Sequence, residues 1–140
     1  MSDRFKLGIT GGIGSGKTTV CKVFGILGVP VFSADTEGKT ITDSDPGVIS
    51  AINTITGKDM YREGSLDRAG LAELIFSNKD LLRQVNEIVH PVVRKRFVEW
   101  SEQQDYPYVI FESAILHESG TWKILDRILT LTAPVDERIE

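Results

Sequence analysis

The sequence predicts an α/β fold in which helices flank a parallel β-sheet. An apolar run at residues 5–10 ends in glycines and opens into a helical pattern. A second apolar run follows at residues 29–34, and strands that are joined through a helix form the parallel βαβ unit. Two more β-rich runs, at residues 106–111 and 127–132, supply further strands of the same sheet.

Composition predicts one globular domain. The chain has 140 residues, of which 41% are hydrophobic and 26% charged, with a net charge of -4. No basic tail or block of like charges is visible, which argues against a nucleic-acid or membrane-surface partner. No apolar run approaches the roughly 18 residues that cross a bilayer, and residues 1–6 are too polar for a signal peptide. Cys21 is the only cysteine. Because no membrane span and no signal peptide are visible, we expect a cytoplasmic protein, and a lone cysteine, which cannot form an intramolecular disulfide, fits a reducing compartment.

The first strand leads into a phosphate-binding loop. Gly11, four further residues and then Gly16, Lys17 and Thr18 match the pattern GxxxxGK(S/T) between a strand and a helix. Residues without Cβ atoms let the backbone amides approach an anion at the positive end of the helix. Lys17 would reach the β- and γ-phosphates, and the Thr18 hydroxyl would bind Mg²⁺. The alternative is a glycine-rich turn without a ligand. The predicted nucleotide contacts are Gly11, Gly12, Gly14, Ser15, Gly16, Lys17, Thr18 and Thr19.

The helix that follows this loop is expected to run from Gly16 to residues 25–27, with Gly28 as its C-cap. We interpret Cys21 as a small buried residue on this helix, and a reactive thiol near the phosphate site is the alternative. The apolar face of the helix would consist of Val20, Val23, Phe24 and Leu27.

Asp35 directly follows the second predicted strand. In open α/β sheets, ligands gather beyond the carboxyl ends of the strands, so its position makes this carboxylate a candidate site residue. Aspartate is also a favoured N-cap, here for a helix at residues 36–41. The sequence favours neither the site role nor the N-cap role of Asp35 over the other, and the two roles do not exclude each other.

The middle of the chain reads as helices. The Ser-Asp-Pro-Gly cluster at residues 44–47 marks a turn before a helix at 48–55. Residues 57–65 are polar and contain glycines, which is typical of a loop. A helix at 66–76 would carry Asp67 as an acid in its first turn.

The longest helical pattern covers residues 81–100, after a turn at 77–80. Pro91 falls inside it and predicts a kink or a break at His90, with two helices meeting there. A histidine in this position is more often a capping or core residue than a ligand contact. The basic run that follows is usually a solvated face, and an anion contact is the alternative for Arg94, Lys95 or Arg96.

The strand at 106–111 ends in Glu112. In phosphoryl-transfer proteins with this type of loop, a carboxylate at the end of a neighbouring strand holds Mg²⁺, and Glu112 is our candidate. The alternative is that it caps a helix starting near Glu118. A helix is expected to begin at Val135, after the fourth strand at 127–132.

Five blocks carry a resemblance to a known family: LGITGGIGSGKTTV, the FSAD that ends at Asp35, SLDRAGLAELIF, NEIVHPVVR around His90, and FESAILHESG. In order and spacing they resemble the dephospho-coenzyme A kinase family. The resemblance implies a P-loop NTPase fold similar to that of nucleoside monophosphate kinases. It also implies a reaction in which ATP and Mg²⁺ phosphorylate the ribose 3′-hydroxyl of dephospho-coenzyme A to give coenzyme A.

The resemblance assigns roles to individual residues. Lys17 and Asp35 would be catalytic, with the Asp35 carboxylate facing the 3′-hydroxyl, where it can orient the alcohol and accept its proton. Residues 58–90 would form a helical insertion that holds the acceptor. The candidate substrate contacts are Arg68 and His90 within this insertion and Arg94 just after it. The expected partner is a small-molecule substrate, and the oligomeric state stays open.

The chain departs from the family pattern at two places and in length. Glu112 and Ala114 stand where the family commonly has Asp and Pro, which weakens the metal assignment. The family also continues through an arginine-bearing lid, a last strand and a last helix, so we expect residues 1–140 to be a C-terminally incomplete kinase domain. Two alternatives stay open, which are another small-molecule or nucleotide P-loop kinase and a nucleotide-binding fragment without catalysis.

Overall fold

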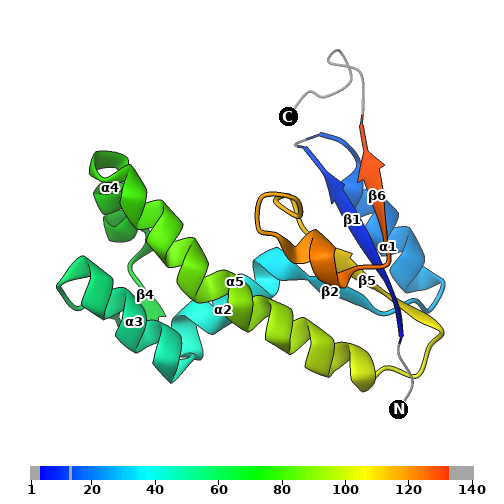
Figure 1. Cartoon of the computed structure of the whole chain (residues 1–140), viewed down its shortest axis with the longest axis horizontal. Helices are drawn as coiled ribbons and strands as arrows, with labels where there is room; N and C mark the ends of the chain where they lie inside the picture. The colour runs from blue at the N-terminus through cyan, green and yellow to red at the C-terminus, as the bar shows by residue number, and fades with distance from the viewer. Residues whose placement is uncertain (1–3, 13, 133–140) are drawn as a thin grey trace. The chain divides into compact units, whose positions relative to one another are not determined.

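The computed structural model describes residues 4–12 and 14–132 (Figure 1). The chain divides into two compact units, and each is described by itself. The first consists of Met1–Asp35 and Arg96–Glu140, and the second of Thr36–Lys95. The predicted insertion at residues 58–90 falls within the second unit.

A four-stranded parallel sheet forms the centre of the first unit, which confirms the predicted fold class. The strand order is β2-β5-β1-β6, so β5 lies between the two strands of the predicted βαβ unit. Ile9 of β1 pairs with Glu112 of β5, and Thr10 pairs with Thr130 of β6. The strands are β1 (Phe5–Gly11), β2 (Val31–Ser33), β5 (Tyr108–Glu112) and β6 (Arg127–Leu131).

Helix α1 (Lys17–Ile26) covers one face of this sheet. Its partly buried residues pack against a core of Ile9, Val29 and Ile110, and they are Val20, Cys21 and Phe24. The predicted apolar face is wrong for Val23 and Leu27, which are 51% and 68% exposed. The helix therefore buries a narrower stripe than its apolar spacing indicates.

Strand β2 is shorter than predicted and leads directly into helix α2 (Ala34–Ser44). Pro30 cannot donate a ladder hydrogen bond, although its carbonyl still accepts one from the amide of Ile110, at 3.0 Å. Because α2 begins at Ala34, Asp35 lies inside the first helical turn. The alternative in which Asp35 is the N-cap of this helix is therefore wrong, and its role as a site residue stays a prediction.

An aromatic cluster lies between the sheet and the end of helix α5 (Lys79–Glu102). The ring centroid of Phe97 is 5.3 Å from that of Phe32 and 4.9 Å from that of Phe111. Trp100 completes the cluster, at 5.3 Å from Phe32. Edge-to-face aromatic pairs at such distances add about 0.5–1.5 kcal/mol beyond their buried area. This packing fixes β2, which leads into the helical turn that carries Asp35, and β5, which ends at Glu112.

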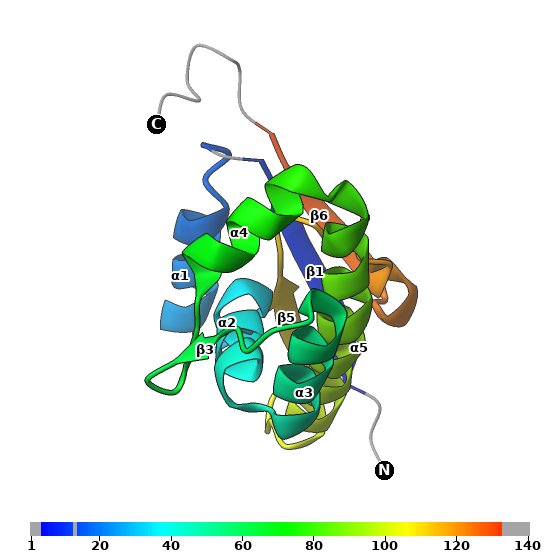
Figure 2. The ribbon, with the colours of Figure 1, turned by 90° about the vertical axis from the view of Figure 1, so that its left-hand side faces the viewer.

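The second unit contains most of α2, then α3 (Pro46–Thr56), α4 (Arg68–Ser77) and most of α5 (Figure 2). Asp45 caps α3 by accepting a hydrogen bond from the Val48 amide at 3.1 Å, with Pro46 at the first helical position, which confirms the predicted helix start. The predicted loop at 57–65 is partly wrong, because it contains a short hairpin of β3 (Tyr61–Arg62) and β4 (Ser65–Leu66).

Asp67 has a more specific role than the sequence predicted. It is the N-cap of α4 rather than a first-turn acid, and its carboxylate accepts a hydrogen bond from the Gly70 amide at 3.0 Å. This cap satisfies one of the amides that every helix leaves without a partner in its first turn.

Helix α5 runs without interruption through Pro91, so the prediction of two helices is wrong. A proline inside a helix costs about 3 kcal/mol. Here Pro91 is exposed, while the apolar side chains on the opposite side are buried and each contribute about 1.5–3 kcal/mol. Continuous burial therefore outweighs the lost hydrogen bond. The buried residues are Leu81, Val85, Val89, Val93 and Phe97.

The connection from β5 to β6 contains turns and a short 3₁₀ helix, η1 (Thr121–Ile124). No helix starts near Glu118 in this described segment, so the alternative role of Glu112 as a helix cap is wrong. The predicted helix at Val135 lies outside the described residues. Within the described ranges, the helices are all too short or too polar to cross a membrane.

Candidate functional site

The loop between β1 and α1 is shaped by its glycines. Gly16 has a φ of 86°, in the left-handed region that residues with a Cβ rarely adopt. It is also the N-cap of α1 and brings no side chain to the helix amides. A Cβ on Gly11 would lie 2.9 Å from the carbonyl oxygen of Leu131, so the start of the loop is pressed against the end of β6. These constraints leave backbone amides at the start of a helix, where an anion is favoured.

A cavity of about 420 Å³ opens over this loop. It gathers all eight predicted nucleotide contacts with Asp35, which lies in the first turn of α2, and with Ala114, which follows β5. Its volume is within the usual range of ligand sites, about 300–1,000 Å³. The residues around it are Gly11, Gly12, Gly14, Ser15, Gly16, Lys17, Thr18, Thr19, Asp35 and Ala114.

An ion pair joins the Lys17 ammonium to the Glu112 carboxylate, with Lys17 donating a hydrogen bond to Oε2. Parallel strands β1 and β5 end at the same edge of the sheet, which brings together two residues 95 positions apart. Their side chains are only 13% and 11% exposed. The lysine that would reach a phosphate is thus paired with the Glu112 carboxylate.

The residues at this edge fit a magnesium ion. Mg²⁺ keeps several water ligands and is usually held by one or two carboxylates together with substrate phosphates. Glu112 would supply the carboxylate, and Thr18 lines the loop cavity. The described part of the chain contains no cluster of three or more His, Cys, Asp or Glu side chains suited to a metal. An ion bound here would therefore depend on the nucleotide for part of its coordination.

Cys21 lies one helical turn after Lys17 and is partly buried. Burial raises the pKa of the Cys21 thiol, and the negative charge of Glu112 raises it further, against a smaller opposing effect of Lys17. The thiol is therefore protonated at neutral pH and a poor nucleophile. This favours the interpretation of Cys21 as a small packing residue over the reactive alternative.

Arg68 is held within the second unit by the end of α2. Its guanidinium forms an ion pair with Asp43, with 3.1 Å between Nη2 and Oδ1, and donates to the Thr42 hydroxyl at 3.0 Å. Asp43 also accepts a hydrogen bond from the Leu66 amide, at 3.0 Å. Asp43 was not predicted as a partner, because no local pattern connects residues 25 positions apart.

His90 lies on α5, half-buried, with Arg94 one turn further along. Burial lowers the pKa of the His90 imidazole, and the positive charge of Arg94 lowers it further. His90 is therefore neutral at physiological pH. A neutral imidazole offers one donor and one acceptor to a ligand rather than a charge.

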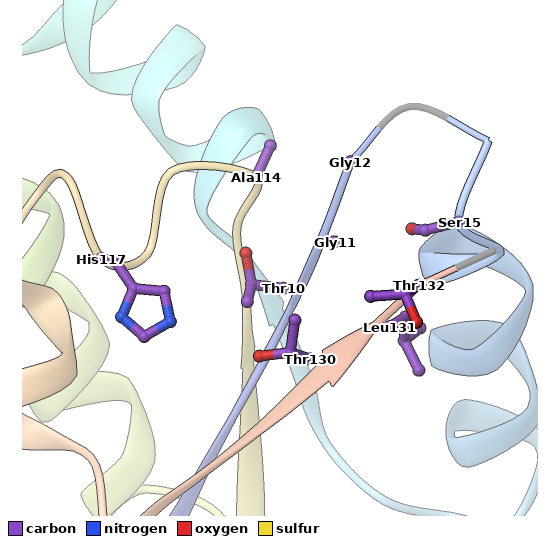
Figure 3. A pocket seen from close by; sticks show the side chains of 9 residues that line it. All are labelled: Thr10, Gly11, Gly12, Ser15, Ala114, His117, Thr130, Leu131 and Thr132. Atoms are coloured by element: carbon purple, nitrogen blue, oxygen red, sulfur yellow. The ribbon is translucent and has the colours of Figure 1, made fainter. Parts of the chain in front are cut away.

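A second, smaller pocket of about 230 Å³ adjoins the loop cavity (Figure 3). Sequence reasoning missed it, because its residues come from the ends of β1 and β6, the loop, and the segment after β5. We refer to it as the His117 pocket, and it is lined by Thr10, Gly11, Gly12, Ser15, Ala114, His117, Thr130, Leu131 and Thr132.

Comparison with known proteins gives consistent matches. A family model described as dephospho-CoA kinase matches residues 5–140. A protein of Porphyromonas gingivalis named dephospho-CoA kinase is 42% identical over 134 residues, which cover 96% of this chain and 66% of that protein. A protein of the same name in Bacteroides fragilis is 39% identical over 136 residues, with the same two coverages. The chain thus spans 66% of the length of these two relatives.

Two solved structures are similar to this chain in fold. TT1252 from Thermus thermophilus has a TM-score of 0.81 and 31% sequence identity, and the superposition covers 98% of this chain and 70% of that one. The dephospho-CoA kinase from Campylobacter jejuni has a TM-score of 0.67 at 18% identity, covering 95% and 91% of the two chains. At that identity the second structure supports the fold alone.

Proposed function

The chain belongs to the dephospho-CoA kinase family, and from this premise we propose that the protein uses ATP to phosphorylate the ribose 3′-hydroxyl of dephospho-coenzyme A, which gives coenzyme A. One observation carries the proposal beyond family membership. Asp35, in the first turn of α2 directly after β2, lines the same cavity as the residues of the phosphate-binding loop. A phosphate donor and a general base would therefore share one cavity.

The donor would lie along the loop. Backbone amides and the positive end of α1 would bind the α- and β-phosphates of ATP, and Lys17 would leave Glu112 to contact the β- and γ-phosphates. Thr18 and Glu112 are the residues that would hold Mg²⁺. When bound, the ion neutralises the charge on the transferring phosphoryl group.

The acceptor would approach from the Asp35 side. Asp35 would orient the 3′-hydroxyl and accept its proton as the oxygen bonds to the γ-phosphorus. The bond from that phosphorus to the β,γ-bridging oxygen breaks, and ADP leaves. Phosphoryl transfer has a loose transition state, so positioning and charge neutralisation supply most of the rate.

The second unit would hold the acceptor. Residues 58–90, with Arg68, His90 and Arg94, remain our candidates for contacts to dephospho-coenzyme A. Arg68 is already paired with Asp43, so it would contact an anionic substrate with its remaining N–H groups or by exchanging partners. The partner is thus a small molecule rather than a nucleic acid or a membrane. We place the reaction in the cytoplasm, as the single cysteine indicates.

A transfer assay tests the proposal. The purified protein is supplied with Mg-ATP and, in separate reactions, with dephospho-coenzyme A, nucleoside monophosphates or shikimate. We expect ADP release that depends on dephospho-coenzyme A and is abolished in Lys17→Ala. Faster turnover of another acceptor would favour a different small-molecule kinase. Binding of Mg-ATP without turnover of any acceptor would favour the non-catalytic alternative.

A further inference from the structure

We propose that Asp43 is a positioning residue for the acceptor. It stays paired with Arg68 and fixes the guanidinium, whose remaining N–H groups bind the diphosphate of dephospho-coenzyme A. The inference rests on the proposed function in one respect, which is that Arg68 contacts the acceptor. It adds a residue to the site and excludes an exchange in which Arg68 leaves Asp43 for the diphosphate.

The contacts of Arg68 are the first argument. One nitrogen, Nη2, donates to three oxygen atoms near the end of α2. These are the Lys39 carbonyl oxygen at 3.3 Å, the Thr42 hydroxyl at 3.0 Å and Asp43 Oδ1 at 3.1 Å. Arginine has five N–H donors, and the three on Nε and Nη1 have no acceptor among the described residues. Because the Arg68 side chain is 44% exposed, a ligand can reach these three donors.

The groups that hold Arg68 are themselves fixed. Asp43 Oδ1 also accepts a hydrogen bond from the amide of Leu66, a buried residue, at 3.0 Å. Thr42 is buried too, and its hydroxyl donates to the Lys39 carbonyl oxygen at 3.0 Å. If Arg68 left for the diphosphate, the Asp43 carboxylate would stay in place and repel the bound anion. An exchange of partners would therefore lose the ion pair without removing the competing charge.

The place of Arg68 in α4 is the third argument. Asp67 is the N-cap, so Arg68 is the first residue of the helix. The free amides make this end of a helix positive, and a cation there is unfavourable for the helix itself. Proteins break local rules of this kind mainly at functional sites. The Asp43 carboxylate, which comes from α2, offsets part of the repulsion and holds the cation in position.

The acceptor has one group that suits a fixed guanidinium. At neutral pH the negative charge of dephospho-coenzyme A lies on the diphosphate that joins the adenosine to the pantetheine arm. A guanidinium is planar and always charged, and its N–H groups bind phosphate oxygens in a defined geometry. Ordering a long side chain on binding lowers affinity. Because the contacts with α2 restrict Arg68 before the acceptor arrives, less side-chain freedom is lost.

Calorimetric titration with dephospho-coenzyme A tests the inference, on protein that is saturated with Mg-ADP so that the loop is filled. Thr42→Val removes one acceptor of Arg68 without changing the charge. Asp43→Asn removes the charge and keeps an oxygen for the Leu66 amide. We expect about three- to tenfold weaker binding in each variant, because the ligand must then order the arginine. Tighter binding in Asp43→Asn would show that the carboxylate competes with the ligand, which would overturn the inference.

The variant Arg68→Ala separates positioning from an effect on the fold. Without the guanidinium, Asp43 has nothing to position, so adding Asp43→Asn to Arg68→Ala is expected to cause no further loss of affinity. A further loss of the same size as in the single variant would show that Asp43 acts on the fold, and the inference would be wrong. Undiminished binding in Arg68→Ala would also overturn it and would leave the proposed function intact.

Thr54→Val is the matched control. Thr54 is an exposed residue of α3 in the same unit, and its hydroxyl also donates to a backbone carbonyl of its own helix, that of Ser50, at 2.9 Å. Its substitution is expected to leave the affinity for dephospho-coenzyme A unchanged. If the unaltered protein does not bind dephospho-coenzyme A, the proposed function itself fails, which is a distinguishable result.

Discussion

Replacing Glu112 with glutamine (E112Q) is expected to change nucleotide affinity in opposite directions with and without magnesium. The substitution keeps the length of the side chain and removes its charge. Glu112 forms an ion pair with Lys17, and the two side chains are only 11% and 13% exposed. A polyphosphate that arrives without a metal must therefore compete with Glu112 for the lysine.

The size of the expected change in nucleotide affinity follows from the ion pair between Lys17 and Glu112. A hydrogen bond between charged groups contributes about 1.5–3 kcal/mol, and each 1.4 kcal/mol is about a factor of ten in affinity. Because the amide oxygen of E112Q can still accept from the lysine, we expect the lower limit, which is about tenfold tighter binding of metal-free ADP. With Mg²⁺ the sign reverses, since a neutral amide is a poorer ligand for the ion, and we expect Mg-ADP to bind about three- to tenfold more weakly.

Isothermal titration calorimetry with ADP, in EDTA and in excess Mg²⁺, measures both affinities. The control E87Q breaks the ion pair of Glu87 with Arg83 on α5, where the side chains are 63% and 58% exposed. Exposed pairs contribute at most about 1 kcal/mol to stability, so this variant should leave both affinities unchanged. A shift of both affinities in the same direction in E112Q would show that Glu112 does not both restrain the lysine and hold the metal.

Three further predictions concern single residues. Asp35→Asn is expected to retain ADP affinity and to lower the rate of phosphoryl transfer about 10²- to 10⁴-fold in single-turnover measurements, and a normal rate would exclude Asp35 as the base. The pKa of His90 is lowered below 6.5 in the folded state, so the unfolded chain binds more protons there as the pH falls through that value. The free energy of unfolding in urea should therefore decrease below about pH 6.5 in the unaltered chain, and less so in His90→Gln; equal slopes would contradict this. Because the pKa of the Cys21 thiol is raised, partly by Glu112, dithionitrobenzoate should label it more slowly than a free thiol at neutral pH, and E112Q should accelerate labelling. Slower labelling in E112Q would show that Glu112 does not act on the thiol.

Features that depend on local chemistry could be predicted from the sequence. A few neighbouring residues determine the backbone conformation of the glycine loop. The same is true of the start of α3 at Asp45 and Pro46. The parallel sheet could be predicted because a helical pattern joins the first two apolar runs, as in a βαβ unit. Pro91 misled the prediction because the local cost of a proline was outweighed by burial along the whole of α5, which no short window contains.

Features that depend on distant residues could not be predicted. Lys17 and Glu112 were each given a role, yet their direct pairing depends on β5 lying next to β1, which the sequence does not specify. The same holds for Arg68 and Asp43. His117 lies in the block FESAILHESG, but it was given no role, because the sequence does not show that the segment after β5 lines a pocket together with the ends of β1 and β6.

The most direct test of the central claim is a crystal structure with Mg-ADP and dephospho-coenzyme A bound. We expect the β-phosphate to accept hydrogen bonds from the amides of residues 14–18 and the ribose 3′-oxygen to lie within hydrogen-bond distance of the Asp35 carboxylate. A β-phosphate bound away from these amides, or an Asp35 side chain directed away from the 3′-oxygen, would contradict it.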